Sequence, residues 1–421
     1  MSLILGARLT LQQLWASREG RRFCRRWYVV RNQVFLVLVC FCIAVLSGCG
    51  SVSGSSNPQP SPSPTPSGSP SPSPSPSPAP ATASRFIYGI SVFESDTGYE
   101  GGRINTTSGK VTPLAPFDNS GLGQNIVPQL IADPTGHFLY ALNLGASSFG
   151  NTIGNPGIAE LAINQQTGAL SAISGSPLVF PSQRSGLLVI NPAGNLLFQP
   201  DAGVFDVYSI NPASGLLTQI ATSTAASLGA FTAFSPDGRF LFNAGNTDVE
   251  TLSVDSSGNL AIVQPPIPTG GSTSGLVGQL AASPDGKFLY VLNEGSIAIF
   301  NIGSSGTLTP VVGSPFATQA AGAGFALTPD GKHLYVNFQN TVNSVQGFTF
   351  DPATSTLTPI ANAMVNNASS ITVDGSGKFA YISQGSSLIT FAIDPATGGL
   401  TQVSRSPQPL SDTPQSIVAV P

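Results

Sequence analysis

The sequence predicts an all-β fold, a seven-bladed β-propeller made of four-stranded antiparallel blades. The first observation is a turn that is followed by an aromatic strand, as in "SPDGKFLY" from Ser283. This turn occurs six times, and its glycines recur at intervals of 44–58 residues: Gly136, Gly194, Gly238, Gly286, Gly331 and Gly377. A period of about 40–50 residues with strand character is typical of a propeller blade. The second observation is that the two ends of the chain match complementary parts of one further unit.

Each unit contains four runs with the character of β-strands. In the unit around Ser283 these runs are "GQLAAS", "KFLYVLN", "SIAIFNI" and "LTPVV". A second turn, such as "DPATGGL" at Asp394, joins the third run to the fourth. In both turns proline sets φ, and a glycine takes the left-handed conformation that returns the chain. The "FLYVLN" run is apolar on both faces, as expected for a sheet that packs between two neighbouring sheets.

The repeated turn decides how its charged residues are interpreted. Asp285 and Lys287 flank a glycine and resemble a small site, but equivalent residues return in other units. We therefore predict that the turn is architecture and that Asp285 bonds within it. Calcium is not expected there, because no further Asp or Asn ligands stand at alternate positions.

The first and last segments of the repeat pattern predict how the ring closes. "SRFIYGIS" from Ser84 matches the aromatic run without its preceding turn, and "PQSIVAVP" from Pro414 matches the first run without its following turn. Together they predict a composite blade formed by residues 85–118 and 413–421. Such a closure removes the open edge that a sheet would otherwise expose.

Residues 1–48 differ from the rest and predict a lipoprotein signal peptide. Seven arginines precede an uncharged run of 13 residues, Val34–Leu46, which is short for a membrane span but suits a secretory signal. The run ends in "LSGC", which resembles a bacterial lipobox, so Cys49 is expected to carry lipid. A plain signal peptide and an anchor helix are the alternatives.

Residues 49–84 are expected to link the lipid to the propeller of residues 85–421. The Pro/Ser alternation of residues 57–80 favours polyproline II and cannot form a core. Cleavage before Cys49 would leave one cysteine, hence no intramolecular disulfide, and nine basic against 19 acidic residues. Nucleic acid is therefore not expected as a partner; the expected contact is with a membrane, through the lipid on Cys49. Gly50 stands where an aspartate would favour inner-membrane retention, so an outer membrane or the cell surface is favoured.

Three segments carry a resemblance to a known family: "SPDGKFLYVLN", "TPDGKHLYVNF" and "DPATGGLTQV". They resemble the seven-bladed propellers that include the 6-phosphogluconolactonase-type lactonases and the surface proteins with YVTN-like repeats. The resemblance covers residues 85–421 and implies the propeller fold, with lactone hydrolysis as the activity of the lactonase members. WD repeats are disfavoured, because both tryptophans lie within residues 1–48.

Candidate site residues lie in the loops that precede the first strands or join second to third strands. Arg184 precedes a first strand, and Asp201, Asp248 and Glu294 follow second strands. An arginine facing carboxylates could orient a lactone carbonyl while a carboxylate activates water. Salt bridges or solvated loop charges are the alternative interpretation. Further acids in such loops are Glu94, Asp96, Glu100 and Glu250.

The two histidines of the chain do not fit a catalytic pattern. Members of the family that act on lactones tend to bring histidine to the channel mouth, whereas His137 and His333 are predicted at the opposite hairpin ends. Their non-equivalent places in distant blades make a poor metal pair, so neither a metal nor a cofactor is expected.

Three functions follow from these observations. The neutral loops and the histidine pattern favour a noncatalytic module that binds an envelope protein, a glycan or a small molecule. The family resemblance supports a lactone hydrolase, although a sugar phosphate fits poorly with an acidic, exported domain. The linker is compatible with a structural surface-layer protein. The segment between Leu144 and Gly157 is the longest loop within a blade and is a further candidate for binding.

Overall fold

The computed structural model describes residues 85–421 except 93–96, 118–128, 144–155, 183–185, 202, 225–228, 230, 272–278, 339–343, 361–362, 364, 405 and 411–413. The predicted signal peptide, Cys49, the linker and most of the loop after Leu144 lie outside these residues. The described part is built from strands and turns. Among its residues, no helix is long and apolar enough to cross a membrane.

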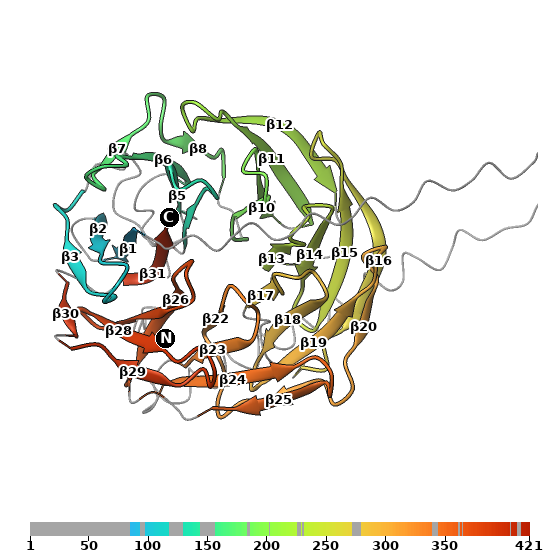
Figure 1. Cartoon of the computed structure of the whole chain (residues 1–421). Coiled ribbons are helices and arrows are strands. Elements are labelled where there is room, and N and C mark those ends of the chain that lie inside the picture. The colour runs from blue at the N-terminus through green and yellow to red at the C-terminus, as the bar shows by residue number, and fades with distance from the viewer. Residues whose placement is uncertain are drawn as a thin grey trace, which may run out of the picture. The chain divides into compact units, whose positions relative to one another are not determined.

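Seven antiparallel sheets are arranged as blades around a ring (Figure 1), which confirms the predicted all-β, seven-bladed propeller. From the inner to the outer strand, blade 1 consists of β31 (Pro414–Val420), β1 (Phe86–Val92), β2 (Thr97–Ile104) and β3 (Val111–Pro113). Blade 2 consists of β4 (Gln129–Ala132), β5 (Phe138–Asn143), β6 (Gly157–Ile163), β7 (Leu170–Ala172) and a short β8 (Leu178–Val179). Blade 3 consists of β9 (Val189–Ile190), β10 (Leu196–Asp201), β11 (Val204–Ile210) and β12 (Leu217–Thr224).

The remaining blades repeat this order. Blade 4 consists of β13 (Phe231–Phe234), β14 (Phe240–Ala244), β15 (Asp248–Val254) and β16 (Leu260–Pro268). Blade 5 consists of β17 (Gln279–Ala282), β18 (Phe288–Asn293), β19 (Ser296–Ile302), β20 (Leu308–Pro310) and β21 (Phe316–Ala317). Blade 6 consists of β22 (Gly324–Leu327), β23 (His333–Asn337), β24 (Val345–Asp351) and β25 (Thr356–Pro359). Blade 7 consists of β26 (Ala368–Val373), β27 (Phe379–Gln384), β28 (Ser387–Ile393), β29 (Leu400–Gln402) and β30 (Gln408–Pro409).

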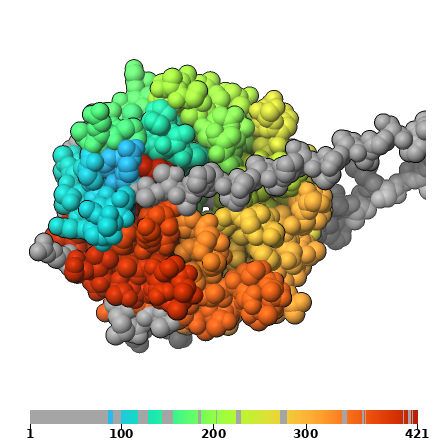
Figure 2. Space-filling view, in the orientation of Figure 1, coloured from blue at the N-terminus to red at the C-terminus, as the bar shows by residue number. Residues whose placement is uncertain are grey.

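The composite blade forms as predicted. The strand β31 pairs antiparallel with β1, from Phe86 opposite Val420 to Ile90 opposite Ser416. In the space-filling view, the first described residues therefore lie against the last ones, shown in blue and red (Figure 2). The ring thus closes through hydrogen bonds between the two ends of the domain.

The repeated turn is held by its own side chains, which confirms its architectural role. The Ser283 hydroxyl accepts a hydrogen bond from the Phe288 N–H at 2.9 Å and donates one to Asp285 Oδ1 at 2.6 Å. The same carboxylate accepts from the Lys287 N–H at 3.1 Å. Gly286 has φ +72°, a conformation that side chains disfavour. These bonds fix the hairpin between the first and second strands.

Aromatic residues from one blade fit beneath glycines of the next. A Cβ atom at Gly168 of blade 2 would lie 2.5 Å from the Phe86 ring of blade 1, and one at Gly306 of blade 5 would meet Phe240 equally closely. His333 of blade 6 occupies this place beneath Gly398 and is 2 % exposed. Glycine is needed at these turns because the neighbouring ring fills the space of a side chain.

Neighbouring inner strands are joined by polar side chains. Gln129 of β4 accepts from the Leu188 N–H at 2.6 Å and donates to the Leu188 carbonyl at 2.9 Å. Gln279 of β17 accepts from the Phe325 N–H of blade 6 at 2.9 Å. An inner strand is the edge of its sheet, so its outward backbone groups need such partners.

At two outer interfaces between blades, the backbone N–H of a leucine that begins a fourth strand is hydrogen-bonded by a side chain of the preceding blade. The side chain is a glutamate at one interface and a glutamine at the other. Glu160 of β6 accepts a hydrogen bond from the Leu217 N–H of blade 3 at 3.0 Å. Gln264 of β16 accepts from the equivalent Leu308 N–H of blade 5 at 2.5 Å and donates to its carbonyl at 3.1 Å. Glu160 is 1 % exposed, and this burial raises the pKa of its carboxyl, although bonds from Leu217 and Ser176 act in the opposite direction.

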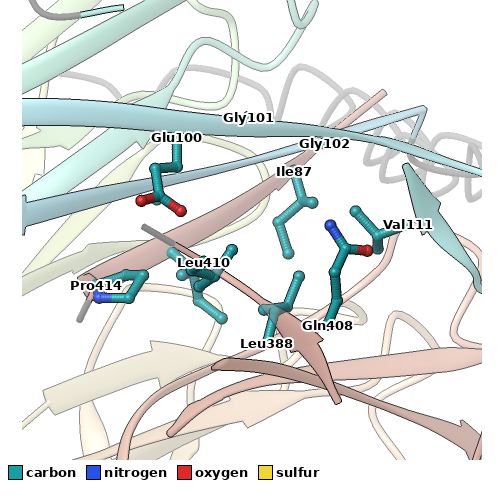
Figure 3. Close-up of a pocket in the computed structure, with 11 residues that line it drawn as sticks. Ile87, Glu100, Gly101, Gly102, Val111, Leu388, Gln408, Leu410 and Pro414 are labelled. Carbon is teal, nitrogen blue, oxygen red and sulfur yellow. The ribbon is translucent and has the colours of Figure 1, made fainter. Parts of the chain in front are cut away.

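A small pocket with a cavity volume of about 20 Å³ lies between the composite blade and blade 7 (Figure 3). Its origin is visible in the registers. Gly102 pairs with Ile87, whereas the corresponding third-strand positions of the other six blades hold large side chains: Leu161, Tyr208, Leu252, Phe300, Phe348 and Phe391. Val111 lines the pocket at a place where the other fourth strands carry leucine: Leu170, Leu217, Leu260, Leu308, Leu357 and Leu400. The closing interface therefore carries smaller side chains at these two positions than the other interfaces do.

Replacing Val111 with leucine is expected to raise the free energy of unfolding by about 0.8 kcal/mol, because it buries one further methylene group in the pocket. Urea denaturation measures the change. The matched control is Leu308→Val in blade 5, which should lower stability by about 1 kcal/mol because it removes a methylene from a filled interface. A loss of stability in the Val111→Leu variant would show that the pocket cannot accept the added group.

Glu160→Gln is expected to stabilise the protein at neutral pH by about 1–3 kcal/mol, because it removes a charge from a buried interface and keeps the acceptor for Leu217. Because the pKa of Glu160 is raised in the folded state, its contribution to folding stability is fully present below its pKa in the unfolded chain, about 4.3. This contribution is lost as the pH rises through the pKa of the folded state. The gain should therefore vanish near pH 4 and reach a plateau at higher pH.

Thermal unfolding between pH 4 and pH 8 measures this dependence. Gln264→Glu is the reverse exchange at the matching interface and should destabilise the protein at neutral pH. Equal melting temperatures of wild type and Glu160→Gln across the range would contradict the conclusion that burying the charged Glu160 carboxylate destabilises the protein.

Candidate functional site

The ring has two chemically different ends. At the base end, hairpins join the first strand of a blade to the second and the third to the fourth. At the mouth end, hairpins join the second strand to the third, and the chain passes from one blade into the first strand of the next. We use these two names below. The predicted site residues that the structure describes belong to the mouth end.

Three predicted carboxylates lie at the mouth end on successive blades. Asp201 closes β10 and pairs with Val204 across the hairpin of blade 3. Asp248 begins β15 of blade 4 and is half-buried, and Glu294 is exposed in the turn between β18 and β19 of blade 5. Within the described ranges, no group of three or more His, Cys, Asp or Glu side chains could hold a metal ion. The structure therefore presents these acids along an arc of the mouth.

Arg184 lies outside the described residues, as do Glu94 and Asp96. The chain two residues after Arg184 is described, however. A Cβ atom at Gly186 would lie 2.5 Å from the Pro200 carbonyl oxygen, so Gly186 rests against the end of β10. The Gln199 amide donates to the Gly186 carbonyl at 3.3 Å and holds the loop there.

Buried carboxylates stand just below the mouth. Glu250 of β15 accepts a hydrogen bond from the Asn243 amide at 2.7 Å. Asp206 of β11 accepts from the Gln219 amide and the Thr222 hydroxyl, both at 2.9 Å. Glu250 was among the acids expected in these loops from the sequence, whereas Asp206 was not.

A shared position in the blade could have identified Asp206. Asp206 pairs with Gln199, Glu250 pairs with Asn243, and Glu100 pairs with Gly89. These are equivalent places on the third strand, so an alignment of the blades by their turns brings the three acids into one column. In blade 1 this position lines the closing pocket, where the Glu100 carboxylate points inward (Figure 3).

Amide side chains tie the loops of the mouth to the strand ends. Asn293 at the end of β18 donates to the Thr269 carbonyl at 3.2 Å, in the segment that leads into its own blade. Asn337 at the end of β23 donates to Ala368 of the next blade at 3.3 Å, and Gln384 donates to Asn366 at 2.6 Å. These bonds tie the described ends of three connecting segments to the strands of the ring.

Both histidines lie at the base end, where the sequence placed them. His137 is in the turn of blade 2, with Nδ1 2.7 Å from the Thr135 hydroxyl. His333 is buried beneath blade 7, with Nδ1 3.1 Å from the Thr349 hydroxyl. Neither ring faces the carboxylates of the mouth hairpins.

The chain is similar in sequence or in structure to several known proteins. The model of the family described as "Lactonase, 7-bladed beta-propeller" matches residues 187–368. No curated protein matches the sequence. Among solved structures, a periplasmic gluconolactonase from Pseudomonas aeruginosa is 19 % identical, with a TM-score of 0.63 over 80 % of this chain and 99 % of that one.

Two further structures, from Bacteroides fragilis and Bacteroides uniformis, are named as candidate 6-phosphogluconolactonases. Each is 18 % identical to this chain. The TM-scores are 0.64 and 0.63, over 82 % and 80 % of this chain and 100 % and 99 % of the others. At this identity the likeness establishes the fold.

The comparison corrects the functional expectation. The neutral loops and the position of the histidines favoured a noncatalytic binding module, and this interpretation was wrong, because the matching family model is that of lactonases. The lactonase alternative is the better supported one. The resemblance inferred from the repeated turns is confirmed: this chain is a seven-bladed β-propeller, and its residues 187–368 match the model of the lactonase family.

Proposed function

We propose that the protein is a lactone hydrolase whose active site lies at the mouth end of the ring. The observation that carries this proposal is the lactonase family match over residues 187–368. That segment includes the hairpins that hold Asp201, Asp248 and Glu294. The fold shared with a periplasmic gluconolactonase supports the same conclusion.

The proposed reaction needs one base and one stabilising cation. A carboxylate takes a proton from water, and the water oxygen forms a bond to the lactone carbonyl carbon. The guanidinium of Arg184 stabilises the negative charge that develops on the carbonyl oxygen. The ring C–O bond then breaks, and the leaving oxygen takes a proton, which yields the open hydroxy acid.

The backbone register supports Asp201 as the base. The strand β9 pairs with β10 through Ile190 opposite Leu197 and Val189 opposite Phe198. Continued by three residues, this register sets Gly186 beside Asp201, in agreement with the close approach of Gly186 to Pro200. Asp248 and Glu294 belong to the next two blades and would line the approach to this pair.

Asp201→Asn and Arg184→Ala are each expected to lower kcat/KM for lactones by at least about 100-fold, because they remove the base and the oxyanion partner. The measurement is hydrolysis of a panel of neutral and phosphorylated lactones by the full-length protein. Arg239→Ala is the matched control, because Arg239 pairs with Asp237 at 2.6 Å at the base end. Loss of activity in the control alone, or retained activity in both site variants, would contradict the assignment.

We also propose that the protein is exported and is anchored to the cell envelope by lipid on Cys49, with residues 49–84 as the spacer. The lipobox-like "LSGC" after an apolar run supports this location. Metabolic labelling with radioactive palmitate should mark the wild-type protein and not Cys49→Ser. Equal labelling of the two proteins would rule out Cys49 as the anchor.

A further inference from the structure

A larger cavity, with a volume of about 230 Å³, lies at the periphery of the ring between blade 7 and the composite blade. Its lining includes β3 on one side and, on the other, residues 403–404 and 406–409, which contain β30. These two outer strands are neighbours in Figure 1. A cavity of about 150 Å³ is sufficient to bind benzene. The cavity at the closing interface can therefore hold a molecule with roughly six carbon atoms.

Blades 2 and 7 share the outer structure that borders this cavity in blade 7. The Thr390 N–H of blade 7 donates to the Ser406 hydroxyl at 2.8 Å, and the Glu160 N–H of blade 2 donates to the Ser176 hydroxyl at 2.8 Å. Each serine precedes a proline, and each blade adds a short fifth strand after it. Thr390 and Glu160 also each pair with a tyrosine of the second strand. The two residues therefore occupy equivalent places on the third strand.

In blade 2, the side chain at this place reaches the next blade. The Glu160 carboxylate accepts a hydrogen bond from the N–H of Leu217, the residue that begins the fourth strand of blade 3. Val111 begins the fourth strand of the composite blade and corresponds to Leu217. The Asn105 N–H is bonded to the Lys110 carbonyl at 2.8 Å, so Val111 falls at the next, non-hydrogen-bonded position of the ladder. The N–H of Val111 therefore points away from β2.

The threonine of blade 7 is too short to act as Glu160 does. Thr390 and Val111 both line the cavity. A threonine side chain ends at its γ atoms, two bonds short of the carboxylate oxygens of a glutamate. Blade 5 also has the Ser–Pro segment, and it carries the larger Ile299 at this position. The space that Glu160 fills between blades 2 and 3 is therefore open between blade 7 and the composite blade.

Lys110 supplies a positive charge at the same place. It is exposed, it lines the cavity and it directly precedes Val111. At the base end, Arg239, Lys287 and Lys332 each contact an aspartate two residues earlier, but Lys110 has no such partner among the described residues. The described residues that line the cavity include no carboxylate. The rest of the lining is apolar or uncharged: Pro113, Leu388, Thr390, Val403, Ser404, Ser406, Pro407, Gln408 and Pro409.

We propose that this cavity is a binding site for a small aliphatic carboxylate, separate from the mouth end of the ring. The carboxylate of the ligand takes the place that the Glu160 carboxylate has in blade 2. One of its oxygens accepts a hydrogen bond from the Val111 N–H, and the Lys110 ammonium group pairs with its charge. Hydrogen bonds to an ionised group are stronger than neutral ones. The hydrocarbon part of the ligand lies against Leu388 and Val403.

Butanoate is the probe, and its binding to the full-length protein is measured by saturation-transfer NMR. Butanoate should bind at least about tenfold more tightly than butanamide, which has the same shape but no charge. It should bind at least about fivefold more tightly than acetate, which lacks two methylene groups that the apolar lining would bury. Inorganic phosphate should not displace it. Equal binding of butanoate, acetate and phosphate would show an unspecific attraction of anions to lysine and would overturn the proposal.

Two variants locate the site. Lys110→Gln removes the charge from an exposed side chain and should weaken butanoate binding at least about tenfold. Thr390→Glu supplies a carboxylate from the protein itself, as Glu160 does in blade 2, and should abolish binding. Lys332→Gln is the matched control, because Lys332 pairs with Asp330 at 3.6 Å at the base end, and its dissociation constant should equal that of wild type. Unchanged binding in both Lys110→Gln and Thr390→Glu would overturn the proposal.

Thermal unfolding supplies a second readout that does not depend on any enzymatic activity. A ligand that binds only the folded state stabilises it, and this ligand would contact both blades of the closing interface. Butanoate should therefore raise the melting temperature of wild type with increasing concentration, and the rise should be smaller in Lys110→Gln. An equal rise with butanamide would show that the carboxylate is not recognised. A rise as large in Lys110→Gln as in wild type would overturn the assigned position of the site.

Discussion

Each blade is apolar on both faces, and this constraint governs the whole domain. A sheet such as β17–β20 buries one face against blade 4 and the other against blade 6, so no blade is stable at the end of a row. A closed ring gives every sheet two neighbours. The pairing of β31 with β1 is the step that makes this possible, and the inner-strand glutamines and the glycine–aromatic contacts depend on the blade spacing that closure sets.

The distribution of chemistry between the two ends follows from the repeat. At the base end, the turns are fixed by Ser, Asp and Gly, and this end varies little from blade to blade. At the mouth end, the hairpins and connecting loops are free of that requirement. Blades 3, 4 and 5 there carry Asp201, Asp248 and Glu294, while blades 2 and 5 end their second strands in Asn143 and Asn293. Variation concentrated on a fixed ring is the usual way in which one fold acquires a specific site.

The fold could be predicted from the sequence because its signals are local and repeated. The repeated turn can be recognised in each unit by the spacing of its proline and its left-handed glycine. The split unit at the chain ends is recognised from the same repeat. The candidate site was only partly predictable, because its residues are related by register across strands. Asp206 becomes recognisable once it is set opposite Gln199, and Glu100 proves to line an interface between blades. The functional expectation was wrong for a related reason: the position of the histidines was informative about the base end and carried no information about the carboxylates at the mouth.

The composite blade also has a mechanical consequence. The chain enters the propeller at Arg85, whose N–H is bonded to the Val420 carbonyl at 2.8 Å, and continues directly into β1. This strand lies between β31 and β2, with antiparallel ladders on both sides. A pull on the preceding segment therefore loads two ladders in shear along the strand, and their bonds must break together instead of one after another. The place where the ring is closed is thus also the place where the domain can best resist tension from its N-terminal side.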